Sequence, residues 1–336
     1  MSIIGLEIKK LPGSLVEITG EIEVDDFERA RQNALQELND KTNLPGFRMG
    51  HVPERVLLDR IGEQVVVERA AEIALQKAYP EIIKENKIEV IGRPQITITK
   101  IARKNPLGFK IVTTVLPEIA LPDYKALARS KMAEKEAVVV SDQELEETLD
   151  YLRKSKNKEQ PPELNDEFAK SVGGFNTVDE LKNAIRHNLQ IEKEIRAKEA
   201  RRMAALEEIS KKSATIIPEI LVEAEKNKML EELKASINQF GLKWADYLAH
   251  IKKTEEELVN GWRQDAEKRS RYGLILREIA NKENIEPTAE ELDNYALQII
   301  SREPENERSK IDKGRLRDYA YGILRNEKVF QFLENS

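Results

Sequence analysis

The sequence predicts an α+β N-terminal domain, in which an antiparallel sheet packs against helices, followed by a mainly α-helical C-terminal domain with long arm helices. Three observations predict this fold class. Strand-like runs rich in Val, Ile and Thr lie almost entirely before Pro122, helix caps dominate after it, and 336 residues exceed the usual length of one domain. The chain is therefore expected to be elongated and multidomain.

The N-terminal part alternates strand and helix patterns. Strands are expected where β-branched residues are frequent and apolar residues alternate with polar ones, at residues 14–24, 89–91, 95–101 and 108–115. Helices are expected where apolar residues recur at helical spacing, at residues 25–39, 53–61 and 63–86. Asp25 is expected to cap the first of these helices, and Pro53 suits the first turn of the second.

Helical patterns dominate after Pro122, where only residues 137–140 still resemble a strand. Ser141 and Glu144 have the spacing of a capping box, and Thr177 also precedes a long run without helix breakers. Helices are expected at residues 141–156, 177–212, 218–240, 254–283, 288–302 and 311–333. The second of these would be roughly 50 Å long, which is more than a compact domain needs. A polar double-proline linker at residues 155–162 follows the first.

Composition excludes several classes of function. The chain has no cysteine, which excludes disulfides, thiol catalysis and thiolate metal sites. Its three histidines, His51, His187 and His250, lack metal-ligand spacing, and no nucleophile accompanies a base. We therefore expect no catalytic residues, no metal and no cofactor. A net charge of −6 argues against a basic nucleic-acid-binding domain. Early charge and the lack of long apolar runs argue against a signal peptide or membrane span, so the cytoplasm is the expected location.

The most informative segment is residues 44–53. Two prolines and two glycines within it exclude a continuing helix or a central strand, so it must be a turn or loop. The loop nevertheless carries Phe47 and Arg48 side by side, with His51 three residues further on. Such a pair suits docking on a partner, because Phe supplies buried area and Arg binds carboxylate or phosphate. The alternative is a loop that folds Phe47 back onto its own core.

The segment Gly46-Phe47-Arg48-Met49-Gly50-His51-Val52-Pro53 resembles the ribosome-docking signature of trigger factors, bacterial chaperones that bind the ribosome at the exit of the nascent-chain tunnel. The signature reads Gly-Phe-Arg-x-Gly-Lys-x-Pro and lies between two helices. Residues 117–119, residues 164–169 and the helix after Thr177 resemble further segments of the family in the same order. The resemblance implies ribosome-binding residues at Gly46, Phe47, Arg48, Gly50, His51 and Pro53. His51 replaces the signature lysine, so a largely neutral imidazole stands where the family has a permanent cation.

One departure from the family is large. Trigger factors usually carry a peptidyl-prolyl isomerase domain between the segments that correspond here to residues 141–156 and 162–169, which a few polar residues join in this chain. The resemblance therefore implies a form without this domain, and we expect no enzyme activity. The expected domains are residues 1–117 for ribosome docking, 118–163 for a linker and connecting helix, and 164–336 for a helical chaperone domain with arms.

Apolar residues form stripes along the two longest predicted helices. Most of these residues are expected to bury against the opposite stripe, and the rest to line a partly exposed cradle for unfolded chains. Methionine adds adaptability to such a surface. The expected client-contacting residues are Met203, Leu206, Met229, Leu233, Ile237 and Phe240.

The resemblance thus implies an ATP-independent chaperone that docks at the exit tunnel through the 46–53 loop and shields nascent or unfolded polypeptides with its arms. The implied partners are these polypeptides and the ribosome near the tunnel, through its protein and also its rRNA. No membrane is implied, and a weak homodimer is left open. Two alternatives stay open: a non-ribosomal holdase that docks weakly because of His51, and a helical scaffold or interaction protein whose stripes are fully self-buried.

Overall fold

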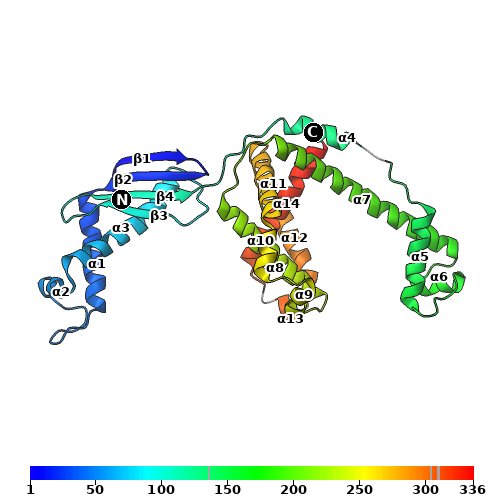
Figure 1. Ribbon diagram of the computed structural model, residues 1–336, viewed down its shortest axis with the longest axis horizontal. Helices are drawn as coiled ribbons and strands as arrows, with labels where there is room; N and C mark the ends of the chain where they lie inside the picture. Colours follow the sequence, from blue (N-terminus) through cyan, green and yellow to red (C-terminus); the bar gives the residue numbers. More distant parts are fainter. Residues whose placement is uncertain (135–136, 303–304, 309–310) are drawn as a thin grey trace. The chain divides into compact units, whose positions relative to one another are not determined.

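The computed structural model describes residues 1–134, 137–302, 305–308 and 311–336. They form two compact units, one made of Met1–Glu118 and Thr215–Arg271, the other of Ile119–Ala214 and Tyr272–Ser336. A four-stranded antiparallel sheet with helices forms the N-terminal part, and the described remainder is mainly helical (Figure 1). The predicted fold class is confirmed.

The sheet has the order β1 (Ile3–Leu11), β2 (Leu15–Ile22), β4 (Leu107–Thr114) and β3 (Gln95–Lys100). All neighbouring strands are antiparallel, and Ile111 of β4 lies between Ile18 of β2 and Ile96 of β3. The strands predicted at residues 14–24, 95–101 and 108–115 are confirmed. β1 was not predicted, because most of its residues are exposed at the sheet edge and it therefore lacks a clear alternation of apolar and polar residues.

Two predicted strands are wrong. Residues 89–91 contribute an isolated bridge, with Val90 opposite Val115, and no strand. Residues 137–140 are not in a strand either. The carbonyl oxygens of Val138 and Val139 instead accept hydrogen bonds from the side chains of Gln190 at 3.0 Å and Lys193 at 2.8 Å. Side chains thus satisfy the backbone groups that a neighbouring strand would otherwise bind.

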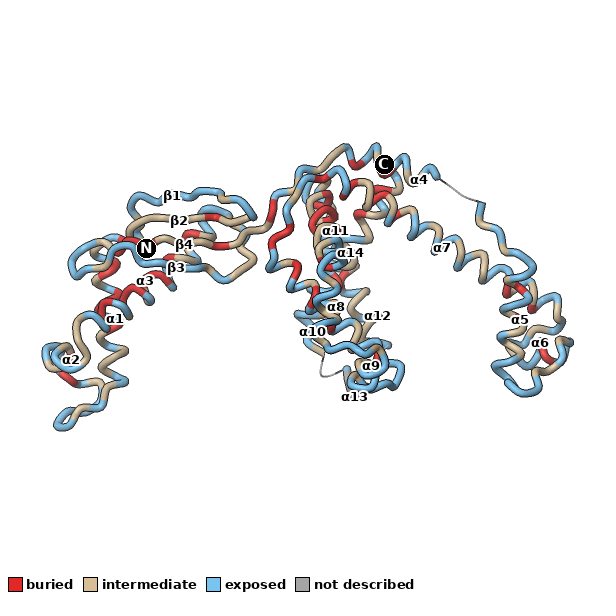
Figure 2. Tube along the Cα trace, viewed as in Figure 1, coloured by how far each residue is buried: buried red, intermediate tan, exposed pale blue. Residues whose placement is uncertain are grey.

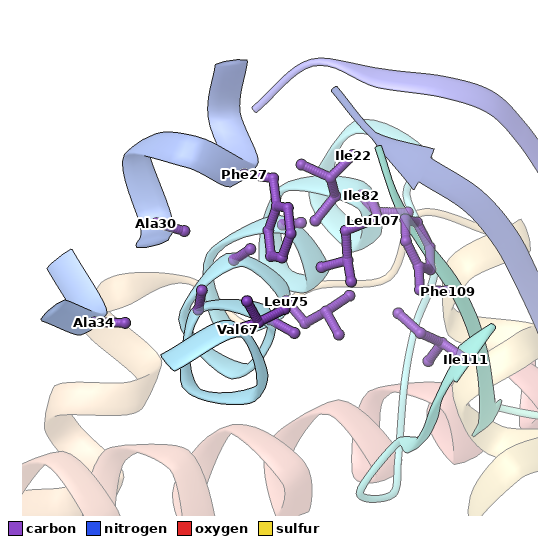
Figure 3. Close-up of a cluster of buried hydrophobic side chains, with 14 of the residues drawn as sticks. Ile22, Phe27, Ala30, Ala34, Val67, Leu75, Ile82, Leu107, Phe109 and Ile111 are labelled. Atoms are coloured by element: carbon purple, nitrogen blue, oxygen red, sulfur yellow. The ribbon is translucent and has the colours of Figure 1, made fainter. Parts of the chain in front are cut away.

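Helices α1 (Val24–Lys41) and α3 (Glu63–Glu85) pack against each other, and α2 (Glu54–Ile61) lies between them in the chain. Their core with the sheet includes Phe27 of α1, Leu75 of α3 and Phe109 of β4 (Figure 3). Small side chains allow α1 and α3 to pack closely; Ala30, Ala34, Ala70, Ala71, Ala74 and Ala78 are all buried. This core supports the helix that leads into the 44–53 loop.

The N-terminus of α1 differs from the prediction. Glu23 is its N-cap, not Asp25, which lies in the first turn. Asp26 accepts a hydrogen bond from the backbone N–H of Ser2 at 2.6 Å, and this bond holds the pKa of Asp26 below its ordinary value. Both aspartates favour the helix start because their negative charge complements the positive end of the helix dipole.

The remainder of the first unit is helical. It contains α8 (Glu219–Gln239), α9 (Trp244–Ile251), α10 (Glu255–Gly261) and the first part of α11 (Arg263–Lys282). The single helix predicted at residues 254–283 is wrong. The structure has two helices there, because α10 ends at Gly261 and Trp262 separates it from α11. The predicted start of this helix agrees with the structure, in which Thr254 and Glu257 form a reciprocal capping box at the start of α10. α9 was not predicted.

The second unit consists of helices with two separate cores. Its elements are α4 (Tyr124–Ala133), α5 (Asp142–Lys156), α6 (Asp166–Gly173), α7 (Val178–Lys212), the end of α11, α12 (Ala289–Arg302), α13 (Glu305–Arg308) and α14 (Lys313–Glu334). One core joins α5, α6 and the start of α7 through residues such as Leu145, Phe168 and Leu181. The other joins α4, the end of α7, α11 and α14 through residues such as Leu206 and Ile275.

The middle of α7 belongs to neither core. Its residues are exposed or half-buried (Figure 2), and Ile195 is among the exposed ones. The capping box of Ser141 and Glu144 at the start of α5 is confirmed, as is the long helix after Thr177. α4 and α6 were not predicted. Across the described residues, each helix is too short or too polar to cross a lipid bilayer.

Candidate functional site

The loop between α1 and α2 contains two consecutive turns. The N–H of Phe47 donates to the carbonyl of Leu44 at 3.1 Å. Pro45 occupies the second position of this turn, and Gly46, with φ of 87°, occupies the third. Proline followed by a residue with positive φ is the arrangement of a type II turn, in which glycine suits the third position best. Gly46 is therefore required by the backbone.

The second turn has the same pattern four residues later. The N–H of His51 donates to the carbonyl of Arg48 at 3.0 Å, and Gly50, with φ of 80°, is the third residue. The positive φ favours glycine here, and a Cβ atom on Gly50 would also lie 2.7 Å from Oδ1 of Asp40, whose exposed side chain would have to move. The two turns place Phe47 and Arg48 at their junction.

Phe47 and Arg48 both face solvent. The loop lies at the end of α1 that points away from the sheet (Figure 1), and Phe47 keeps 40% of its surface exposed. Arg48 is exposed and makes no ion pair with any described residue. The alternative in which Phe47 folds back onto the core does not fit this exposure. An accessible ring beside an unpaired guanidinium can bind an apolar site bordered by acidic or phosphate groups.

The remaining loop residues lead the chain into α2. His51 and Pro53 are exposed, whereas Val52 between them keeps only 3% of its surface accessible. Pro53 is the N-cap residue of α2. The side chain of Asn39 binds both backbone groups of Val52: it donates to the carbonyl at 2.9 Å and accepts from the N–H at 3.1 Å.

A buried arginine anchors the helices on both sides of the loop. Arg31 of α1 lies 2.9 Å from Glu54, the first residue of α2, and also 2.9 Å from Glu63, the first residue of α3. The hydrogen bonds from Arg31 hold the pKa of Glu63 below its ordinary value. The hydrogen bonds to Glu63 and then Glu54 raise the pKa of Arg31, although burial opposes this rise. The helices beside the loop are thus held by the ion pair of Arg31 and Glu63, and both groups are ionised at neutral pH.

The structure corrects two of the predicted client-contacting residues. Leu206, 1% exposed, lies in the core formed by α4, α7, α11 and α14, and Ile237 is 6% exposed on α8, which α9 and α10 contact. Neither side chain is accessible to a client. Met203 and Phe240 are exposed, and Met229 and Leu233 are half-buried. Only the exposed fraction of each side chain in the structure distinguishes the accessible residues from the buried ones. The stripe pattern in the sequence does not show which face of a helix its neighbours cover.

Phe240 is exposed at the turn between α8 and α9, and two half-buried aromatic residues, Trp244 and Tyr247, follow it in α9. Leu242 is also exposed, and the rings of Trp244 and Tyr247 stack with their centroids 5.6 Å apart. Nε1 of Trp244 donates to Glu255 at 2.8 Å, which orients the indole. Leu242 and Trp244 were not among the predicted client-contacting residues. The available signal was the concentration of large apolar residues beside Gly241 in an otherwise polar segment.

The described residues contain no group of three His, Asp or Glu side chains placed to hold a metal ion. A surface hollow of about 340 Å³ lies between α5 and α7, bordered by Glu144, Lys193 and Tyr151. Lys193 and the cap residue Ser141 lower the pKa of Glu144 to about 2. These groups neutralise one another and complete a helix cap, so they serve structure rather than proton transfer.

An exposed aromatic–arginine loop and exposed apolar side chains on long helices are typical of proteins that bind other macromolecules through accessible surfaces. Comparison with protein families identifies which one. The family model described as "Bacterial trigger factor protein (TF)" matches residues 5–152, and the model "Bacterial trigger factor protein (TF) C-terminus" matches residues 177–334. The chain belongs to the trigger factor family of chaperones.

Relatives resemble the chain over nearly its full length. The trigger factor of Halothermothrix orenii is 28% identical over 98% of this chain and 98% of its own, and that of Caldicellulosiruptor bescii is 26% identical over 98% and 96%. A solved structure described as "Promiscuous Substrate Recognition in Folding and Assembly Activities of the Trigger Factor Chaperone" shares the fold, with a TM-score of 0.61 and 18% identity over 98% of this chain and 99% of that one.

The comparisons also bear on the missing domain. Neither model covers residues 153–176, and no model of a peptidyl-prolyl isomerase domain matches the chain. The alignment with the Halothermothrix orenii protein extends over 427 positions, more than the 336 residues available here. That alignment therefore contains long gaps in this chain.

Proposed function

We propose that this protein is an ATP-independent, cytoplasmic chaperone that docks on the ribosome near the exit tunnel through residues 46–53 and shields emerging polypeptides with its helices. In this proposal residues 1–117 dock, residues 118–163 connect, and residues 164–336 hold the client. The proposal rests on one observation above all: Phe47 and Arg48 are exposed together at the junction of two glycine-dependent turns.

The composition of the loop supports a ribosomal partner. Aromatic rings and arginines carry much of the binding energy of interfaces, since one supplies apolar area and the other directional charge. Ribosomal surfaces offer both acidic protein side chains and phosphate, either of which a guanidinium can bind through two parallel hydrogen bonds. Arg48 is not already committed to another described residue, so it can form such a contact without breaking one.

Exposed apolar residues on the helices support the holding function. Met203, Phe240 and Leu242 are accessible to an unfolded segment, and the stacked, half-buried rings of Trp244 and Tyr247 follow Phe240 and Leu242 in α9. Charged residues are frequent in the segments that carry these side chains. Scattered contacts of this kind favour weak, rapidly reversible binding of many sequences, which needs no nucleotide.

Cosedimentation with purified bacterial ribosomes tests docking. The double variant F47A/R48A should bind at least tenfold more weakly than the unchanged protein, about 1.4 kcal/mol, with unchanged helical content by circular dichroism. Equal cosedimentation of both proteins would contradict the docking proposal. A non-ribosomal holdase would then remain, provided that the protein still suppresses aggregation of a denatured client.

His51 supports this holdase as a second candidate, because the signature lysine is absent and the loop has one permanent cation fewer. Introducing H51K should tighten ribosome binding if that charge matters, and the gain should shrink as salt is raised, since ions screen exposed charges. A variant that binds no better than the unchanged chain at low salt would show that His51 does not limit docking.

A further inference from the structure

The backbone between α1 and α2 is held at one point by a single side chain. Asn39 lies in the last turn of α1, and its amide binds the N–H and the carbonyl of Val52 together, at 3.1 and 2.9 Å. Its own carbonyl accepts from the N–H of Thr42 at 3.2 Å and of Gly50 at 3.3 Å. One residue thus contacts the start, the second turn and the end of the loop.

The side chain of Asn39 is suited to this contact by its shape and polarity. An amide offers a donor and an acceptor in one plane, so it pairs with both groups of one residue as a neighbouring strand would. The contact is also protected from water on one side, because the side chain of Val52 is buried. Hydrogen bonds that replace lost water contacts contribute net stability, whereas a buried backbone group left unpaired costs more than the bond contributes.

The consequence concerns the loop tip. With Val52 fixed to the end of α1, the free segment shrinks to residues 43–49, which includes Phe47 and Arg48. A shorter closed segment samples fewer conformations, and a binding group that is already in place loses less entropy when it docks. The hydrogen bonds of Asn39 to this segment join it to Thr42, Gly50 and Val52, so its effect on Phe47 and Arg48 passes through the backbone between them.

We propose that Asn39 is a positioning residue for docking: by binding both backbone groups of Val52 it sets the place of Phe47 and Arg48 relative to α1. This inference rests on the proposed docking function. It assigns to Asn39 a role in ribosome affinity although its side chain does not reach the partner.

The test compares ribosome affinities of full-length variants. N39A removes the donor and the acceptor. N39D keeps an acceptor for the N–H of Val52 but turns a carboxylate oxygen toward the carbonyl, which repels it. N43A is the matched control, because Asn43 is the same residue type in the same segment, is exposed, and makes no side-chain hydrogen bond with described residues. We expect N39A and N39D to bind about fivefold more weakly, the effect of about one net hydrogen bond, and N43A to bind within about twofold of the unchanged chain.

A double-mutant cycle separates positioning from general stabilisation. If Asn39 acts by placing Phe47, then F47A should cost much less in the N39A background than in the unchanged chain, so the two effects do not multiply. Circular dichroism and thermal unfolding of each variant confirm the fold, and N39D supplies the cycle if N39A does not fold. The inference would be overturned if the losses of ribosome affinity in N39A and F47A multiplied in the double variant, or if N39A bound ribosomes as tightly as N43A. Loss of binding in N39A with none in F47A would instead contradict the docking proposal itself.

Discussion

Arg31 of α1 and Glu63 of α3 form a two-pronged ion pair in which Nε lies 2.9 Å from one carboxylate oxygen and Nη2 lies 3.2 Å from the other. The arginine side chain is buried, and the glutamate keeps about a third of its surface in water. This pair joins α1 to the start of α3, and Arg31 also binds Glu54 at the start of α2, so one arginine holds both helices that flank the 44–53 loop. The strength of the pair depends on both groups being ionised.

The pair predicts a pH dependence. Arg31 lowers the pKa of Glu63 from its ordinary value of 4.5. A lowered folded-state pKa contributes stability that is present above the unfolded-state pKa and is lost as pH falls through the folded value. The variant E63Q should therefore unfold more easily at neutral pH, by about 1 kcal/mol for a partly exposed pair, and should lose less further stability on acidification.

Thermal unfolding between pH 7 and pH 3, followed by circular dichroism, measures this effect. The matched control is E85Q, since Glu85 lies on the same helix, is exposed and has no partner among the described residues. The account is contradicted if E63Q and E85Q show the same acid dependence.

The exposed residue at the C-terminal end of α8 predicts where clients bind. Phe240 is 79% exposed and Ile237, three residues earlier, is 6% exposed. The variant F240S should reduce suppression of aggregation of a denatured client and leave the protein folded. The variant I237S should instead destabilise α8, by about 2–4 kcal/mol for the loss of a buried aliphatic side chain.

Tryptophan fluorescence separates the two outcomes, because both tryptophans, Trp244 and Trp262, lie in the helical part of the first unit. Client suppression that is unchanged in F240S would move the holding surface elsewhere. The self-buried scaffold would gain support if no exposed apolar residue affected suppression.

A second charged cluster joins α7 to α14, two of the helices that form the core around Leu206 and Ile275. Arg202 of α7 is buried and binds Glu327 through two nitrogens, each at 2.9 Å, and Glu334 at 2.6 Å, both on α14. Burial alone would lower the pKa of Arg202, but its hydrogen bonds to Glu327 and Glu334 outweigh burial and raise it. Removing the arginine leaves Glu327 without an ion pair among the described residues and leaves Glu334 with Lys198, at 3.2 Å, in place of two cations.

The variant R202A should therefore cost about 3 kcal/mol of stability, and R201A, the neighbouring change at an arginine without a described ion pair, should cost under about 1 kcal/mol. Calorimetry of the whole protein compares them. Equal unfolding temperatures would show that the cluster is not stabilising.

The shortened connection between α5 and α6 predicts a missing activity. Residues 157–165 join the two helices, and a segment of this length cannot enclose a proline in an apolar pocket. We expect the protein to leave the cis–trans exchange of a prolyl peptide at its uncatalysed time constant, about tens of seconds or longer. Acceleration in proportion to protein concentration, after contaminating isomerases are removed, would contradict this expectation.

Local signals predicted much of the backbone. The capping boxes at Ser141 and Thr254, and the proline before α8, each act within one helical turn, so the sequence alone locates them. Glycine in the docking loop was equally informative, because Gly46 and Gly50 both require positive φ. Edge strand β1 was missed since it has no fully buried face.

Burial could not be predicted from the same patterns. Met203 and Leu206 belong to one stripe of α7, yet the first is exposed and the second is in a core. Which of them is covered depends on α4 and α14, segments far away in sequence. The role of Asn39 was likewise invisible, because its partner Val52 is thirteen residues distant and is bound through its backbone.

Site-specific cross-linking from the docking loop tests the central claim most directly. The chain has no cysteine, so the variant M49C provides a unique thiol for a photo-activated cross-linker on an exposed residue beside Arg48, and E85C on α3 provides the control. With purified ribosomes, the account predicts that M49C cross-links to components bordering the exit of the nascent-chain tunnel and that adding R48A strongly reduces the yield. Cross-linking from M49C that is no greater than from E85C, or that is confined to ribosomal regions away from the tunnel exit, would contradict it.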